Sequence, residues 1–134
     1  MHADDCPLCR DAAAPVLWRD DSCRVVSAAD ADYPAFLRVI WQAHVREMTD
    51  LDPASQQHLL RVVLAVERVL RAELAPDKIN LATLGNQVPH LHWHVIARFD
   101  WESRFPQPVW SAARRAVEPS AAARLAVPLA RLDA

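Results

Sequence analysis

One stretch of the chain alternates histidine with apolar residues, and it limits the possible fold more than any other segment. It reads Pro89-His90-Leu91-His92-Trp93-His94-Val95-Ile96-Ala97-Arg98-Phe99. Successive side chains of a β-strand point to opposite faces of its sheet. The alternation therefore predicts a strand over residues 91–99, with three imidazoles on one face and apolar side chains in a core on the other. A row of imidazoles indicates phosphate chemistry or a metal site, although a surface strand could carry the same pattern.

The segments around this strand indicate a small sheet. Val16–Arg19 and Cys23–Ser27 are separated by a polar turn and predict a hairpin. Phe36–Trp41 is apolar at nearly every position, so we expect a strand that is buried on both faces. Residues 78–84 alternate apolar and polar side chains and predict a further strand, which precedes the histidine strand.

One long helix is expected over residues 53–74. Asp52 is suited to cap its first turn, Pro53 fits the first helical position, and Pro76 ends it. An apolar stripe recurs at helical spacing at Leu59, Val63, Val66, Leu70 and Leu74. The order of elements predicts an α+β fold, in which one main helix covers an antiparallel five-stranded sheet.

Composition narrows the domain count and the class of partner. The chain has 134 residues, of which 52% are hydrophobic, so we expect one domain with a sizeable core over residues 1–115 and a C-terminal extension, helical in part, over 116–134. The net charge of −2 gives no indication of nucleic-acid binding. The sequence has no membrane-spanning run and no signal peptide, and its odd count of 3 cysteines favours a reducing compartment, so we expect a cytoplasmic protein.

The histidine segment also resembles a known signature. His90-Leu91-His92-Trp93-His94-Val95-Ile96 matches His-φ-His-φ-His-φ-φ, where φ is apolar. This pattern is typical of the histidine triad (HIT) superfamily of nucleotide hydrolases and transferases. The resemblance extends over about residues 6–99 and implies a HIT-like fold and a homodimer in which the sheets join and the main helices pair. Val62, Leu64 and Val69 add apolar surface to the helix, which agrees with that pairing.

The resemblance assigns roles to the three histidines. The central one, His92, corresponds to the nucleophile that attacks the α-phosphate of a nucleotide. His94 corresponds to a residue that lies against the phosphate. His90 corresponds to a residue that orients the site or, in zinc-bearing members, binds the metal. A neutral imidazole is a competent nucleophile toward phosphorus, which agrees with this assignment.

Residues before the triad are candidates for binding the nucleotide. Gly85 is the only glycine, and it permits a tight turn or a close approach of the backbone to a ligand. Asn86 and Gln87 occupy the positions of the family's polar pair, but many members have a hydroxyl where this chain has Gln87. Asn80 resembles an asparagine that contacts phosphate or ribose, and Asp30 lies in the loop that supplies an acidic residue to the ribose; ordinary sheet or loop roles stay open for both.

A metal site is implied by a second set of residues. Cys6-Pro7-Leu8-Cys9 is a Cys-x-x-Cys pair. In some bacterial triad proteins such a pair binds zinc together with histidines at the positions of His44 and His90 here. Two cysteines and two histidines suit a closed tetrahedral zinc site with a structural role. The alternative is a pair of free thiols, with His44 near the start of a helix.

These observations favour a nucleotide hydrolase or nucleotidyl transferase, either a phosphoramidase or an enzyme resembling the dinucleoside polyphosphate hydrolases. It would act on a small-molecule nucleotide through a covalent intermediate on His92. We expect neither nucleic acid nor a membrane as a partner. Gln87 in place of the hydroxyl leaves a second interpretation open, a regulatory module that binds a nucleotide with little turnover. A zinc-stabilised interaction domain is a third.

Overall fold

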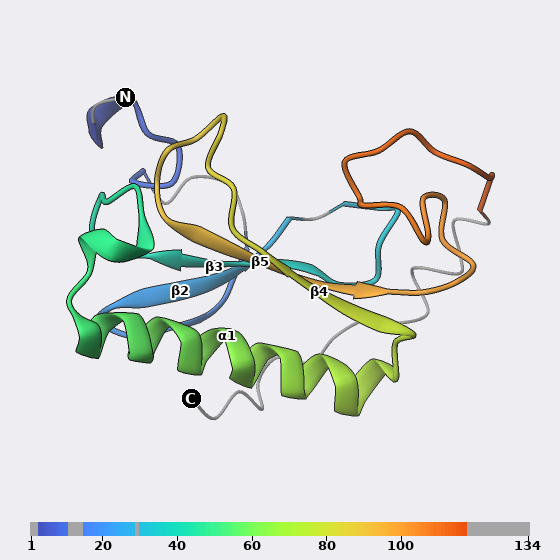
Figure 1. The fold of residues 1–134 in the computed structure, drawn as a ribbon, viewed down its shortest axis with the longest axis horizontal. Helices are drawn as coiled ribbons and strands as arrows, with labels where there is room; N and C mark the ends of the chain where they lie inside the picture. Colours follow the sequence, from blue (N-terminus) through green and yellow to red (C-terminus); the bar gives the residue numbers. More distant parts are fainter. Residues whose placement is uncertain (1–2, 11–14, 29, 118–134) are drawn as a thin grey trace.

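The computed structural model describes residues 3–10, 15–28 and 30–117, which form a five-stranded antiparallel sheet with one long helix along it (Figure 1). The strands lie in the order β1-β2-β3-β5-β4. The elements are β1 (Val16–Arg19), β2 (Cys23–Ser27), β3 (Phe36–Trp41), α1 (Pro53–Leu74), β4 (Lys78–Ala82) and β5 (His92–Arg98). The predicted α+β architecture is confirmed. The C-terminal extension predicted over 116–134, with its helix, lies outside the described residues except for positions 116 and 117.

Local chemistry sets the ends of the helix. The Asp52 side chain accepts a hydrogen bond from the Ser55 backbone N–H at 2.8 Å, and Pro53 is the first helical residue. The helix stops at Leu74 because Ala75 adopts a left-handed conformation with φ 46°, from which its N–H bonds the carbonyl of Arg71. No helix in the described part of the chain is long and apolar enough to cross a membrane.

The core lies between α1 and one face of the sheet. The predicted helical stripe is buried there together with the inward side chains of β2, β3 and β5. Val62 is fully buried in this core rather than available for a second chain. Leu60 and Leu64 are 39% and 44% exposed and form the apolar surface that remains on the helix. Pairing of two copies across this surface stays a prediction.

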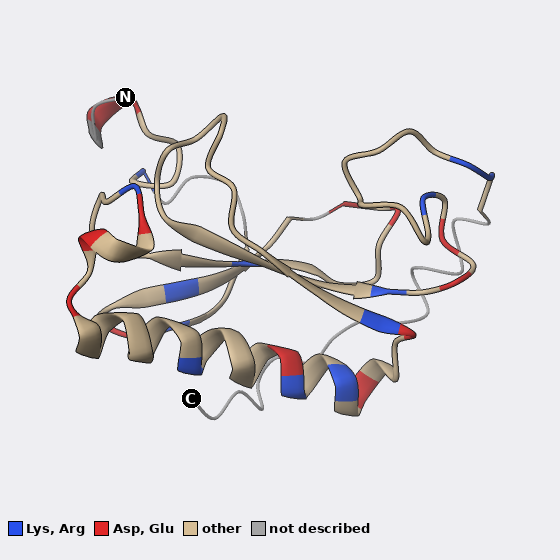
Figure 2. Cartoon of the chain, in the orientation of Figure 1, with Lys and Arg blue, Asp and Glu red and all other residues tan. Residues whose placement is uncertain are grey.

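The opposite face of the sheet carries histidine and basic side chains. On β5, His92 is paired with Ile40 and His94 with Arg38, so these four side chains share one face. Figure 2 shows basic residues on β2, β3, β4 and β5. The prediction that Phe36–Trp41 is buried on both faces is wrong at one position, because Arg38 is only partly buried on the histidine face.

Two groups of loops flank this face. The N-terminal segment, the connection from β3 to α1 and the turn from β4 to β5 lie at one end of the molecule (Figure 1). The loop from β2 to β3 and the segment after β5 lie at the other end. Residues that are far apart in the sequence therefore meet at each end of the histidine strand.

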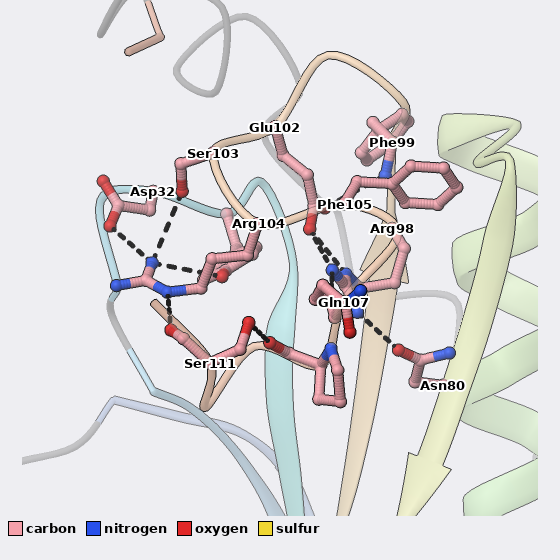
Figure 3. A network of polar contacts seen from close by, with 12 residues as sticks. Asp32, Asn80, Arg98, Phe99, Glu102, Ser103, Arg104, Phe105, Gln107 and Ser111 are labelled. Atoms are coloured by element: carbon pink, nitrogen blue, oxygen red, sulfur yellow. Dashed lines mark hydrogen bonds and ion pairs between the residues drawn. The ribbon is translucent and has the colours of Figure 1, made fainter. Parts of the chain in front are cut away.

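A buried ion pair organises the segment after β5 (Figure 3). Arg98 and Glu102 are 2% and 0% exposed, and the Arg98 Nε–H donates to Glu102 Oε1 at 2.6 Å. Arg98 also donates to Asn80 Oδ1 at 2.7 Å and to the carbonyl of Gln107 at 2.6 Å. The second Glu102 oxygen accepts the Phe99 backbone N–H at 3.0 Å. Every oxygen of the carboxylate is thus used, and the charge of Arg98 is neutralised.

We expect Glu102→Gln to destabilise the protein by about 3–5 kcal/mol, because the substitution leaves the guanidinium of Arg98 buried without its counter-charge. The measurement is the free energy of unfolding in urea. Glu67→Gln on α1 is the control, since Glu67 is partly exposed and forms no ion pair with another described residue; its effect should stay within about 0.5 kcal/mol. Equal effects of the two substitutions would show that the buried pair contributes nothing special.

Candidate active site and metal cluster

The backbone fixes the tautomer of His92 at the start of β5. Its Nδ1 lies 2.6 Å from the carbonyl oxygen of His90. A carbonyl can only accept, so Nδ1 carries the hydrogen and Nε2 keeps its lone pair. His92 is buried, and burial lowers the pKa of its imidazole, against a smaller opposing effect of the His90 carbonyl. At neutral pH the ring is therefore uncharged, with a free nucleophilic nitrogen.

His94 lies beside His92 in a more apolar setting. The centroids of the two rings are 5.0 Å apart, and Phe36 and Trp110 contact His94 edge-on at 5.6 and 5.2 Å. Burial, together with smaller effects of the neighbouring His92 and Arg38, lowers the pKa of His94 to about 4. Its Nδ1 is buried and has no hydrogen-bond partner among the described residues. A polar atom of this kind is available to a ligand.

Both histidines line a cavity of about 510 Å³. The turn between β4 and β5 forms one wall and brings Gly85, Asn86 and Gln87 to the same cavity. Gly85 has φ 76°, a backbone conformation that side chains disfavour, which explains the single glycine of the chain. A second cavity of about 300 Å³ borders Gly85 and His92 from another side. His92 thus lies between two cavities, so a phosphate bound at this residue could have one substituent in each of them.

Two predicted nucleotide ligands lie elsewhere. Asn80 is on β4, where its Oδ1 is already bonded to Arg98, and it borders a different hollow. Asp30 is exposed in the loop from β2 to β3, and its Oδ1 accepts the backbone N–H of Asp32 at 2.9 Å. Neither residue lines the cavity that contains His92 and His94. Contacts of Asn80 and Asp30 with a ligand stay predictions.

The expectation that all three imidazoles form one row is wrong for His90. Its backbone N–H bonds the carbonyl of Val88 at 2.8 Å in a tight turn before β5 begins, so the alternation of the strand does not extend to its side chain. The ring is fully buried, and its Nε2 lies 2.6 Å from the carbonyl of Trp41. Because that carbonyl accepts, Nε2 carries the hydrogen and the lone pair of Nδ1 is free.

This free nitrogen points to the predicted metal ligands. His90 Nδ1 lies 3.4 Å from the sulfurs of both Cys6 and Cys9 and 3.2 Å from His44 Nδ1. Cys9 Sγ is 3.2 Å from the same His44 nitrogen. One ligand atom from each of the four residues lies within 4.8 Å of the others. The structure thus brings all four together, although 81 residues separate Cys9 from His90.

A second cluster of metal-binding residue types has a different character. Asp20, Cys23 and His58 bring their ligand atoms within 4.8 Å. Asp20 Oδ1 accepts the backbone N–H groups of Ser22 and Cys23, and Oδ2 lies 2.7 Å from His58 Nε2. Burial raises the pKa of the Cys23 thiol to about 12. These contacts tie the β1–β2 hairpin to α1 and leave the carboxylate little capacity for an ion.

Arg38 and Trp110 are the polar and the aromatic member of the cavity wall that the sequence did not predict. Arg38 forms no hydrogen bond or ion pair with another described residue, and it lines the cavity beside both histidines. A charged residue inside the apolar stretch Phe36–Trp41 was a signal that could have identified it. Trp110 reaches the cavity from the segment after β5. Nothing in the local sequence pattern indicates that contact.

Comparison with known protein families identifies the family of this chain, because the family model of the HIT domain matches residues 10–101. The chain belongs to the histidine triad family. A histidine triad protein from Bradyrhizobium japonicum is 30% identical, with a TM-score of 0.70 over 84% of this chain and 90% of its own. One from Marinobacter aquaeolei is 28% identical, with a TM-score of 0.73 over 92% and 93%.

A further histidine triad family protein, from Mycobacterium smegmatis, is described as Zn-bound. It is 22% identical, with a TM-score of 0.65 over 92% of this chain and 91% of its own. At that identity the likeness shows the shared fold. No curated protein matches the chain significantly.

We expect the His94 imidazole to titrate near pH 4 in the folded protein. Its pKa is below the ordinary 6.5, so the unfolded chain binds this proton more readily. The contribution of His94 to the free energy of unfolding should be fully present above pH 6.5. It should be lost as the pH drops toward 4, which lowers the free energy of unfolding by up to about 3 kcal/mol. Carbon-13 NMR of labelled histidine gives the titration, and urea unfolding of wild type and His94→Gln gives the difference. A titration midpoint near 6.5 would contradict the burial argument.

Proposed function

We propose that this histidine triad protein is a nucleotide hydrolase or nucleotidyl transferase that acts at the α-phosphate through a covalent intermediate on His92. The observation that carries the proposal is the bond from Nδ1 of His92 to the carbonyl of His90. It leaves a neutral Nε2 lone pair on a residue that lines a ligand-sized cavity. The HIT domain match supports a nucleotide-related activity of this general class.

The reaction has two steps. His92 Nε2 attacks phosphorus, the bond from phosphorus to the leaving group breaks, and the leaving group departs with the electron pair. Water then attacks the same phosphorus and loses a proton, the Nε2–P bond breaks, and a nucleoside monophosphate is released with the imidazole restored. Another acceptor in place of water gives transfer instead of hydrolysis.

The cavity offers groups that suit the charge on the phosphate. Arg38 supplies a positive charge beside two neutral imidazoles, and a guanidinium can donate two parallel hydrogen bonds to phosphate oxygens. The amides of Asn86 and Gln87 add further donors, and the buried Nδ1 of His94 adds another in the tautomer that carries its hydrogen there. Gln87 can donate a hydrogen bond to the leaving group but cannot give it a proton. That proton therefore comes from water.

The second candidate is a regulatory module that binds a nucleotide and turns it over poorly. Gln87 in the place of the family hydroxyl favours it, because proton donation to the leaving group is lost. Release of the monophosphate from adenosine 5′-phosphoramidate and from a diadenosine polyphosphate separates the two functions. Binding of both compounds without product would favour the module.

We expect His92→Ala to reduce turnover by several orders of magnitude, equivalent to about 4–8 kcal/mol of transition-state stabilisation, because the covalent bond cannot form. Binding of AMP should change little. His94→Ala should cost less, since His94 stabilises charge without forming a bond. His58→Gln, outside the cavity, is the control and should retain activity. Near-normal turnover by His92→Ala would exclude the covalent mechanism.

We also propose that Cys6, Cys9, His44 and His90 hold one structural zinc ion. Two thiolates and two imidazoles form a tetrahedral ligand set that zinc prefers, and the complex with Zn²⁺ would be neutral. The Trp41 carbonyl already holds His90 in the tautomer that a metal ligand needs. Without a cation, burial and the neighbouring Cys6 raise the pKa of the Cys9 thiol, which a divalent ion would reverse. The Zn-bound relative from Mycobacterium smegmatis agrees with this proposal.

The zinc proposal predicts about one equivalent of metal in the purified protein. Cys6→Ser should lose that metal and lower the melting temperature, because zinc joins three segments that are distant in the sequence. Cys23→Ala is the matched control, since Cys23 is equally buried but belongs to the hairpin. Elemental analysis makes the measurement on protein purified without chelators. Metal-free wild type, or full metal content in Cys6→Ser, would contradict the proposal.

A further inference from the structure

The segment after β5 holds an exposed aromatic side chain at the triad cavity. Trp110 is 52% exposed, yet it lines the same cavity as His92 and His94. Its indole contacts His94 edge-on, with ring centroids 5.2 Å apart at 68°, and Phe36 at 6.5 Å and 86°. A tryptophan in this position leaves a large apolar surface in water unless a ligand covers it.

A second arginine fixes the turn that carries Trp110 (Figure 3). The Arg104 Nε–H donates to the carbonyl of Ser111, the residue after Trp110, at 2.7 Å. Ser111 bonds the carbonyl of Pro108 through its backbone N–H at 3.0 Å and its hydroxyl at 2.6 Å. The backbone on both sides of Trp110 is therefore held, and the indole itself rests against His94 and Phe36.

The same arginine connects this turn to the loop between β2 and β3. Arg104 lies 3.3 Å from both the Tyr33 hydroxyl and an Asp32 carboxylate oxygen. The buried pair of Arg98 and Glu102 anchors the beginning of the same segment. Trp110 is thus placed at the cavity before any ligand arrives. Binding of a ligand that stacks on it therefore costs little conformational entropy for ordering this side chain.

We propose that Trp110 is the stacking platform for the nucleobase of the ligand that occupies the triad cavity. The inference rests on the proposed function, because it takes that ligand to be a nucleotide. Its phosphate lies at His92 and His94, and the planar base covers the indole face that borders the cavity. Since every base has a π-face, the platform contributes affinity for a base without selecting its identity.

The test compares AMP with ribose 5-phosphate, which has the same sugar and phosphate but lacks the base. Calorimetric titration of the full chain as purified gives both dissociation constants for wild type and variants. We expect Trp110→Ala to weaken AMP binding by about 5- to 150-fold, the range for loss of one base–aromatic stack. Ribose 5-phosphate should bind wild type and variant within about twofold of each other, on the same stacking argument. Trp110→Phe, which keeps a ring, should recover most of the AMP affinity.

Leu84→Ala is the matched control, because Leu84 is 49% exposed and lines the same cavity from the β4–β5 turn. It should leave the ratio of the two dissociation constants unchanged. An equal loss of both ligands in Trp110→Ala would overturn the platform and indicate that Trp110 only positions His94. Unchanged AMP affinity would also overturn it. Wild type that fails to bind AMP would overturn the proposed function as well, whereas base-dependent binding without turnover would overturn the enzymatic function alone.

Discussion

One residue, His90, connects the two chemical centres of this protein. Its imidazole faces Cys6, Cys9 and His44, while its carbonyl oxygen accepts the Nδ1–H of His92. The ring position and the carbonyl position are set together by the tight turn from Val88. Whatever holds the His90 ring therefore also holds the carbonyl group that fixes the tautomer of His92, the proposed nucleophile. The proposed zinc ion would stabilise the site through this residue without touching the substrate.

The electrostatics of the cavity depend on burial more than on net charge. Both strand histidines have lowered pKa values, and that of His94 falls to about 4, so neither contributes a positive charge at neutral pH. Arg38 supplies the charge instead, and its presence on β3 depresses the protonation of its neighbours further. The cavity thereby combines uncharged imidazoles with a fixed cation, which a chain of net charge −2 does not suggest from its composition.

Local periodicity predicted the helix and the strands, and the family resemblance predicted that Cys6, Cys9, His44 and His90 come together. Other contacts between distant residues were missed. The cap at Asp52 and the apolar stripe of α1 followed from helical spacing, and the alternation around His92 gave β5. The alternation placed the His90 ring in one row with His92 and His94. A tight turn from Val88 instead turns that ring toward His44 and the two cysteines before β5 begins. The side-chain oxygen of Asn80 accepts a hydrogen bond from Arg98, 18 residues further along the chain, and no sequence pattern indicates such a partner. Arg38 did leave a signal, as one charge in an apolar strand.

The covalent intermediate is the central claim, and mass spectrometry of the trapped enzyme tests it most directly. The protein would be mixed with adenosine 5′-phosphorimidazolide, denatured within the first turnovers at alkaline pH, digested and mapped. The account predicts that the mass of an adenylyl group appears on the peptide containing His92, that fragmentation places it on that side chain, and that it disappears as AMP accumulates. Release of AMP at the full rate with no adduct on His92 at any time, or with an adduct on another residue, would contradict it.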